Sequence, residues 1–241
     1  MRLICFPYAG GSAMIYARWR RLLPSWIDVM PLELPGRGAR LAEPLHTDLA
    51  GLADQLAAEL TDTAWTPYAL FGHSLGGLIA FEVGHGLRAR GAPSPSMLVV
   101  SGTEAPAMRD GSRWREPLGD DALRGELTRL KGTPPEALDS PEIMSHALPI
   151  LRADFLMCGN YVPRRRKPLC CPIQVFGGDT DETRPEALDA WRDETSASFG
   201  CDIFRGDHFF IHARQSELVN RIAALLAGQS SRQYSAVGAG P

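Results

Sequence analysis

Short, continuous apolar runs alternate with longer amphipathic stretches along most of the chain. In runs such as Tyr68-Ala69-Leu70-Phe71 the residues are apolar at successive positions rather than at every second one. This pattern is typical of strands covered on both faces, as in a parallel sheet. The predicted strands span residues 3–6, 27–33, 68–71, 97–101, 173–176 and 202–204.

The longer stretches carry apolar residues at helical spacing. They predict helices over residues 13–23, 48–61, 75–90, 120–130, 141–157, 185–195 and 216–227. Because strands and helices alternate, the pattern predicts a single α/β domain over residues 1–227. Its mostly parallel, doubly wound sheet has helices on both faces. Residues 228–241 are rich in Gly, Ser and Ala and are expected to form a disordered tail.

One segment interrupts the alternation. Between residues 101 and 173 there are two helical patterns and several prolines, but no strand pattern. A segment of this length must carry structure of its own. It follows a predicted strand, and ligands of open α/β sheets bind outside the carboxyl ends of the strands. We therefore expect a helical insertion over about residues 104–170 that covers the site as a lid, the alternative being a passive helical cap.

Composition and charge exclude several classes of function. Among 241 residues, 44% are hydrophobic and 22% are charged, which is typical of a globular domain. The formal net charge of -3 argues against a general nucleic-acid binder. No run of 18 apolar residues predicts a membrane span, and the start of the chain does not resemble a signal peptide. The five cysteines lack metal-site spacing, so we expect reduced thiols, no metal site and a cytoplasmic location.

The clearest chemical signal is the pentapeptide Gly72-His73-Ser74-Leu75-Gly76, which stands between a predicted strand and a predicted helix. In this context a G-x-S-x-G sequence predicts a nucleophile elbow, with the serine exposed on a strained turn. Side chains at the two glycine positions would crowd such a turn. Ser74 is therefore the candidate nucleophile, and the backbone N–H of Leu75 is a candidate donor to the oxyanion.

A serine nucleophile needs a base, and the base needs an orienting acid. In hydrolases with this elbow the acid and then the histidine follow the serine along the chain. His208 comes directly after the last predicted strand and is the favoured base, with His212 in the next helix as the alternative. Asp181 fits a Gly-x-x-Asp pattern in the loop after residues 173–176 and is the favoured acid. Asp179 in the same loop is the alternative.

The loop after the first predicted strand, Phe6-Pro7-Tyr8-Ala9-Gly10-Gly11-Ser12, contains a pair of glycines that allows the backbone to approach a ligand closely. This loop is expected to supply the second oxyanion donor. Ala9 is the favoured residue and Tyr8 is the alternative. An ordinary Gly-Gly turn into a helix would have the same sequence.

Five segments, which include the elbow and the loop after the first predicted strand, match a family pattern along nearly the whole chain. They are Cys5-Phe6-Pro7-Tyr8-Ala9-Gly10-Gly11, Pro31-Leu32-Glu33-Leu34-Pro35-Gly36-Arg37-Gly38, Phe71-Gly72-His73-Ser74-Leu75-Gly76-Gly77, Leu148-Pro149-Ile150-Leu151-Arg152-Ala153-Asp154-Phe155 and Gly206-Asp207-His208-Phe209-Phe210. With them the chain resembles the external type II thioesterases of polyketide and non-ribosomal peptide synthases, which have the α/β-hydrolase fold. The second and fourth segments are the more specific ones, since catalysis does not require them.

This resemblance implies hydrolysis of acyl thioesters on the phosphopantetheine arm of acyl or peptidyl carrier proteins, which clears aberrant or stalled acyl groups. It implies a triad of Ser74, Asp181 and His208 and a mobile lid. We expect a monomer without a cofactor of its own, since the acyl group arrives on the partner. An acyl-CoA or small-ester hydrolase, and a non-hydrolytic carrier-binding protein, are the rival interpretations.

A basic run at the end of the predicted lid is a candidate docking surface. Carrier proteins are generally acidic, so a basic patch near the mouth of the site would favour association. The run consists of Arg164, Arg165, Arg166 and Lys167. A solvated loop without a binding role is the alternative.

Overall fold

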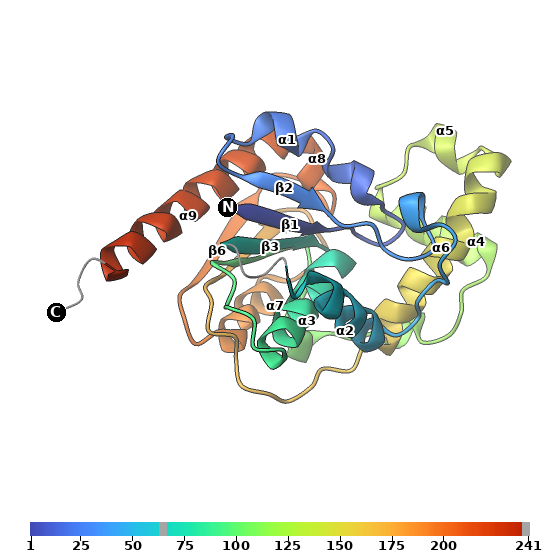
Figure 1. Cartoon of the computed structure of the whole chain (residues 1–241). Helices are drawn as coiled ribbons and strands as arrows, with labels where there is room; N and C mark the ends of the chain where they lie inside the picture. Colours follow the sequence, from blue (N-terminus) through green and yellow to red (C-terminus); the bar gives the residue numbers. More distant parts are fainter. Residues whose placement is uncertain (63–66, 238–241) are drawn as a thin grey trace.

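A single six-stranded sheet forms the centre of the molecule (Figure 1). The computed structural model describes residues 1–62 and 67–237, with side chains up to residue 229. The strand order is β2-β1-β3-β4-β5-β6, and each neighbouring pair is parallel. The predicted strands and the α/β class are confirmed. The strands are β1 (Arg2–Phe6), β2 (Asp28–Pro31), β3 (Tyr68–His73), β4 (Leu98–Ser101), β5 (Ile173–Gly178) and β6 (Phe199–Phe204).

The strand order reverses next to β1. This strand pairs with β2 on one side, where Ile4 faces Met30, and with β3 on the other, where Ile4 faces Leu70. In open α/β sheets, ligands bind outside the carboxyl ends of the strands at such a reversal. The loops that leave β1 and β3 are the predicted oxyanion loop and the predicted elbow, so the topology brings them together.

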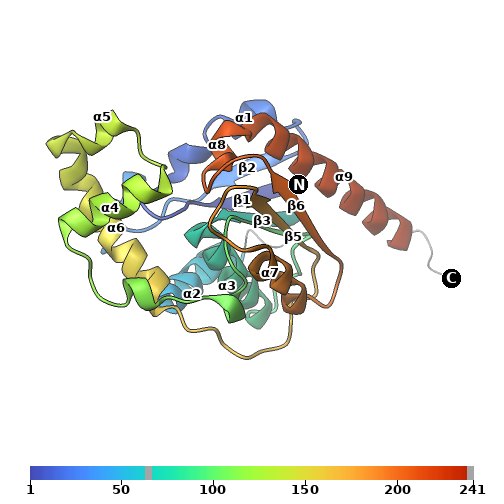
Figure 2. The same ribbon diagram turned by 180° about the vertical axis from the view of Figure 1, so that it is seen from behind.

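Helices cover both faces of the sheet, as Figures 1 and 2 show from opposite sides. Along β1, Ile4 and Phe6 pack into the layer on one face, whereas Leu3 and Cys5 pack into the layer on the other. This two-sided burial explains why the strands are continuous apolar runs. One layer contains α2 (Leu49–Leu60), α3 (Leu75–Ala89), α7 (Pro185–Asp189) and the 3-10 helix η6 (Ala190–Glu194). The other contains η1 (Ala13–Tyr16), α1 (Trp19–Leu22), α8 (Phe210–Ala213) and α9 (Gln215–Val237).

The helical insertion between β4 and β5 is confirmed, and it extends beyond one end of the sheet (Figures 1 and 2). It begins with the 3-10 turns η4 (Pro106–Met108) and η5 (Ser112–Trp114). Its helices are α4 (Asp120–Leu130), α5 (Pro135–Leu138) and α6 (Pro141–Asn160). They share a small core of their own, formed by Leu123, Leu127, Met144, Leu148, Leu151 and Phe155. The insertion therefore packs as a unit against the carboxyl edge of the sheet.

The single helix predicted over residues 13–23 is wrong, because the chain there forms η1 and then the separate short helix α1. Tyr16 and Trp19 are both fully buried, with ring centroids 5.0 Å apart. The Tyr16 hydroxyl also donates to the backbone carbonyl of Phe6 at 2.6 Å. Packing of these aromatic side chains against the sheet thus overrides local helix propensity.

The end of the chain also differs from the prediction. Residues 228–241 are predicted to be disordered, but α9 continues to Val237 and projects away from the body of the molecule (Figure 1). Extending an existing helix needs no new nucleus, and an exposed glycine such as Gly228 costs only about 1 kcal/mol. Residues 238–241 lie outside the described part of the chain. No helix within the described ranges is long and apolar enough to cross a membrane.

Candidate active site

Ser74 lies on the sharp turn between β3 and α3. Its φ of 52° and ψ of -122° are strained for a residue with a side chain. A Cβ atom on Gly72 would overlap the backbone of Gly76, and one on Gly76 would overlap the carbonyl oxygen of Phe6. The Ser74 N–H donates to the carbonyl of Ser101 at 2.7 Å, which ties the turn to β4. The sequence G-x-S-x-G is therefore required here by the lack of space around the turn.

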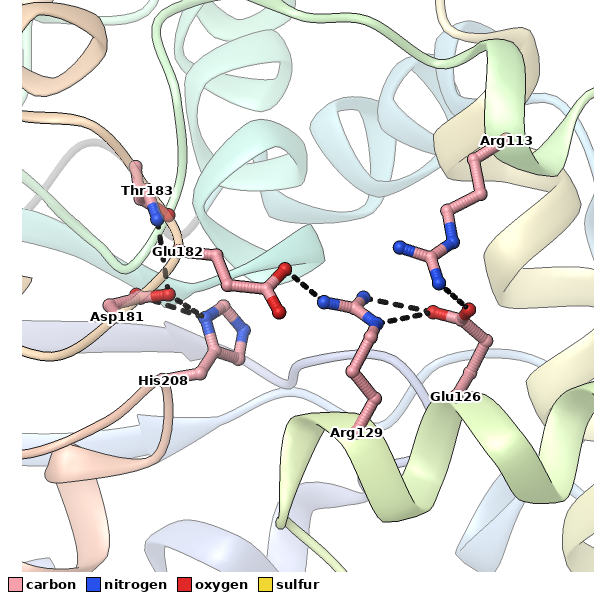
Figure 3. A network of polar contacts seen from close by, with 7 residues as sticks. All are labelled: Arg113, Glu126, Arg129, Asp181, Glu182, Thr183 and His208. Carbon is pink, nitrogen blue, oxygen red and sulfur yellow. Dashed lines mark hydrogen bonds and ion pairs between the residues drawn. The ribbon is translucent and has the colours of Figure 1, made fainter.

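An imidazole–carboxylate pair stands on the loops that follow β5 and β6 (Figure 3). His208 Nδ1 lies 3.0 and 3.2 Å from the two carboxylate oxygens of Asp181. The Asp181 side chain is 3% exposed, and the backbone N–H of Thr183 also donates to it, at 3.3 Å. Burial raises the pKa of Asp181, but the hydrogen bond and charge of His208, with the backbone donors, outweigh burial and leave the pKa below its ordinary value. The carboxylate is thus ionised at neutral pH and can orient the imidazole.

Asp179, the alternative acid, has another partner. Its Oδ1 accepts the backbone N–H of Gly206 at 2.8 Å, which ties the loop after β5 to the loop after β6. The geometry therefore favours Asp181 as the partner of His208, with Asp179 as the residue that braces the two loops.

The alternative base, His212, lies on α8, where its Nε2 is 2.9 Å from the hydroxyl of Tyr8. His73 was missed as a site residue by the sequence analysis, although it belongs to the pentapeptide. It is fully buried, and its ring centroid lies 5.0 Å from that of His208. Burial first, and then the neighbouring His208, lower the pKa of His73 well below its ordinary value, so His73 is a neutral ring beside His208. Its Nδ1 is 2.9 Å from the hydroxyl of Ser101.

A cavity of about 490 Å³ connects these groups with the insertion. Ser74, His208 and Asp181 line one part of its wall, together with the oxyanion loop and Leu75. Apolar side chains of the insertion line another part: Trp114, Leu127, Leu130, Ile143, Met144, Ala147, Leu151 and Phe155. A volume of this size fits a small organic group. An apolar wall beside a nucleophile suits the hydrocarbon part of an acyl group.

The two predicted oxyanion donors, Ala9 and Leu75, both line this cavity beside Ser74. Leu75 is the first residue of α3, and the N–H groups in the first turn of a helix have no partner within the helix. The side chain of Tyr8 packs edge-on against His73 and Phe209. The loop that carries Ala9 and the start of α3 therefore share the cavity wall with Ser74, and their role as oxyanion donors stays a prediction.

A charged network joins the insertion to the loop of Asp181 (Figure 3). Arg129 on α4 forms an ion pair with Glu182, the residue after Asp181. Its guanidinium also pairs at 2.9 Å with Glu126, which pairs in turn with Arg113 at 2.7 Å. The sequence analysis missed this network, since Arg129 and Glu182 are far apart in the chain and neither belongs to a motif.

The basic run predicted as a docking surface lies along α3. Arg166 donates to the carboxylate of Glu82, which is 5% exposed, and its guanidinium lies 5.3 Å from the ring centroid of Phe81. Arg164, Arg165 and Lys167 are exposed. Among the described residues around the cavity, none belongs to this run. Arg166 therefore has a structural role, and docking by the other three stays a prediction.

Within residues 1–62 and 67–229, no group of three or more His, Cys, Asp or Glu side chains could hold a metal ion. The cavity wall instead includes the Ser74 hydroxyl, the Asp181 carboxylate and the His208 imidazole. These residues follow the chain order Ser, Asp, His of hydrolases with a nucleophile elbow.

Known proteins match this chain over nearly its whole length. Residues 1–226 match the model of the thioesterase domain family. The gramicidin S biosynthesis protein GrsT of Aneurinibacillus migulanus is 38% identical over 220 residues, which are 91% of this chain and 86% of that protein. The structure of the RedJ thioesterase from the prodiginine biosynthetic pathway of Streptomyces coelicolor is 37% identical, with a TM-score of 0.88. That match covers 93% of this chain and 90% of RedJ.

The type II thioesterase BorB from the borrelidin biosynthetic cluster also matches, with 36% identity and a TM-score of 0.86. The match covers 93% of this chain and 92% of BorB. These similarities extend over both the sheet and the insertion, and they confirm the α/β-hydrolase fold expected from the resemblance. The chain belongs to the thioesterase family and is an enzyme of that family.

Proposed function

We propose that this enzyme hydrolyses acyl thioesters on the phosphopantetheine arm of acyl or peptidyl carrier proteins, and so clears aberrant or stalled acyl groups in polyketide or non-ribosomal peptide biosynthesis. The observation that carries the proposal is the cavity itself. Ser74, His208 and Asp181 share its wall with apolar side chains of the insertion. The printed names of the relatives, which belong to gramicidin S, prodiginine and borrelidin biosynthesis, support the choice of pathway.

In the proposed mechanism, Ser74 Oγ attacks the thioester carbonyl while His208 Nε2 accepts the hydroxyl proton. Asp181 stabilises the imidazolium that forms, since it holds Nδ1 at 3.0 Å. The N–H groups of Ala9 and Leu75 donate to the oxyanion of the tetrahedral intermediate. The C–S bond then breaks, and His208 returns the proton to the departing thiol of the carrier.

The second half of the reaction releases the acyl group. Water enters beside His208, which takes one of its protons while the oxygen attacks the acyl-enzyme carbonyl. Collapse of the second tetrahedral intermediate frees the carboxylic acid and returns the proton to Ser74. No cofactor of the enzyme's own takes part in this scheme. The enzyme is proposed to act as a monomer in the cytoplasm.

The test compares wild-type protein with Ser74→Ala on a panel of acyl groups loaded on a carrier protein, with free acid measured by mass spectrometry. Ser216→Ala, at an exposed position on α9, is the matched control. We expect hydrolysis by wild type and by the control, and a loss of at least about 10⁴-fold in Ser74→Ala. Equal hydrolysis by Ser74→Ala would refute the mechanism.

The same panel separates the rival substrates. Phosphopantetheine is common to carrier proteins and coenzyme A, so kcat/KM for one acyl group is compared on both. We expect a higher kcat/KM on the carrier protein. A higher value on acyl-CoA would make the enzyme an acyl-CoA hydrolase of the same fold. Carrier binding without any hydrolysis would support the non-hydrolytic alternative.

A further inference from the structure

A buried ion pair joins the insertion to the body of the enzyme, away from the imidazole–carboxylate pair. Arg37 Nη1 lies 2.7 Å from Asp154 Oδ2, and Arg37 Nη2 lies 2.8 Å from Oδ1. Asp154 stands on α6 and is fully buried, while the Arg37 side chain is 4% exposed. The two residues belong to the two segments, residues 31–38 and 148–155, that the triad chemistry does not need.

Such a pair is a weak source of stability. Removing two charges from water costs several kcal/mol per ion, and well-packed apolar residues of similar volume often serve the fold equally well. The pair also makes hydrogen bonds to a neighbouring loop, and these indicate a role other than stability.

Both members of the pair bind the oxyanion loop. Asp154 Oδ2 accepts the backbone N–H of Gly10 at 2.8 Å, and Arg37 Nη1 donates to the carbonyl of Gly11 at 3.2 Å. The pair thus binds the Gly10-Gly11 dipeptide at both ends, through the Gly10 N–H and the Gly11 carbonyl. A Cβ atom on Gly10 would overlap the side chain of Leu151, which lies one turn earlier on α6.

This dipeptide closes a turn around Ala9. The Gly11 N–H donates to the carbonyl of Tyr8 at 2.8 Å, and Gly10 has a φ of +76°. A glycine with positive φ at the third position defines a type II turn, in which Ala9 occupies the second position. Glycine populates many backbone conformations, so a turn with two glycines has little rigidity of its own. The hydrogen bonds to Asp154 and Arg37 restrict the conformation of this turn.

We propose that Arg37 and Asp154 are positioning residues for the oxyanion hole, which hold the turn of residues 8–11 so that the Ala9 N–H faces the intermediate formed on Ser74. This inference rests on the proposed hydrolytic function. Helix α6 then has two roles, since Leu151 lines the acyl cavity and Asp154 accepts a hydrogen bond from the oxyanion loop. Preorganised donors stabilise the transition state more than the ground state, because they act on charge that develops during the reaction.

The test replaces the pair without leaving a buried charge. The double variant Arg37→Met/Asp154→Leu retains apolar packing but removes both hydrogen bonds that the pair makes to residues 10 and 11. The matched control is Arg40→Met/Glu59→Leu, which removes the nearby ion pairs of Arg40 with Glu59 at 2.9 Å and with Glu43 at 2.6 Å; none of these residues binds the oxyanion loop. Each protein is assayed for kcat and KM on a small acyl thioester. Affinity is measured for an alkyl boronic acid, which forms a tetrahedral adduct on the serine, and for an unreactive thioether analogue of the substrate.

We expect kcat and the affinity for the boronic acid to fall together by about 100-fold in the double variant, as for loss of one oxyanion donor. The affinity for the thioether, KM and the melting temperature should stay near those of the control. The proposal is overturned by an unchanged kcat, or by equal losses of affinity for the boronic acid and the thioether, which would indicate general damage to the cavity. If the double variant does not fold, Asp154→Asn takes its place, with the same two affinities as the readout. A wild-type enzyme that neither hydrolyses the thioester nor binds the boronic acid would refute the proposed function instead.

Discussion

The substitution Asp181→Asn tests the assignment of the acid most directly. It retains the size of the side chain, but an amide nitrogen can then face His208 Nδ1, where a carboxylate oxygen now lies at 3.0 Å. An amide that donates to Nδ1 moves the ring proton to Nε2, so the imidazole can no longer accept the proton of Ser74. Asp179→Asn in the same loop is the matched control, because an amide oxygen can still accept the N–H of Gly206.

The expected magnitude follows from the burial of the pair. Asp181 is 3% exposed, so solvent does not screen the interaction of its carboxylate with the imidazolium. Water also cannot take the place of the carboxylate once it is lost. In a serine triad the equivalent loss lowers kcat by about 10⁴-fold, which corresponds to about 5.5 kcal/mol of transition-state stabilisation. Asp179→Asn retains its hydrogen-bond acceptor, and we expect it to change kcat by less than about threefold.

The assay is single-turnover formation of the acyl-enzyme, followed by mass spectrometry of the intact protein, with melting temperatures to confirm folding. A fall of about 10⁴-fold in Asp181→Asn alone supports the triad. The same fall in Asp179→Asn, with Asp181→Asn near wild type, would reverse the assignment. Full activity in both variants would refute the reasoning from the imidazole–carboxylate geometry.

Two further predictions concern the insertion and pH. Glu182→Gln removes the ion pair of Glu182 with Arg129 and leaves the pair of Arg129 with Glu126. Because Glu182 is 70% exposed, the removed pair contributes less than about 1 kcal/mol. Hydrogen exchange in α4 should therefore accelerate up to about fivefold at low salt and not at high salt. Exchange equal to that of wild type and of the exposed control Glu186→Gln would contradict this. Burial, with Arg166 and Arg88 nearby, lowers the pKa of His85 to about 3, whereas a histidine in the unfolded chain has a pKa of about 6.5. Below about pH 6.5, unfolding is therefore coupled to the uptake of a proton by His85. The unfolding free energy of wild type should therefore fall by about 1.4 kcal/mol per pH unit relative to His85→Gln between pH 6 and 4, and parallel curves in urea titrations would exclude this linkage.

The sequence by itself determined the elements that local burial and local sterics control. The continuous apolar runs identified β1, β3, β4 and β5, since each of these strands is covered on both faces. The edge strands β2 and β6 were predicted as well, although they are only partly buried. The spacing of Gly72 and Gly76 identified the elbow, because only glycine fits where the turn meets its own backbone and that of β1. The loops after β1, β5 and β6 followed from the same alternation, and they carry Ala9, Asp181 and His208.

The tertiary structure alone decided which of the candidate polar residues contact one another. Asp179 and Asp181 lie in the same loop, two positions apart. Only the packing of the loops after β5 and β6 gives Asp181 the imidazole and Asp179 a backbone N–H. The contact of Arg37 with Asp154 joins residues separated by 117 positions, which no local pattern reports. The physical reason is that periodicity records whether a side chain is buried, whereas a polar contact depends on the register and packing of elements that are distant in the chain.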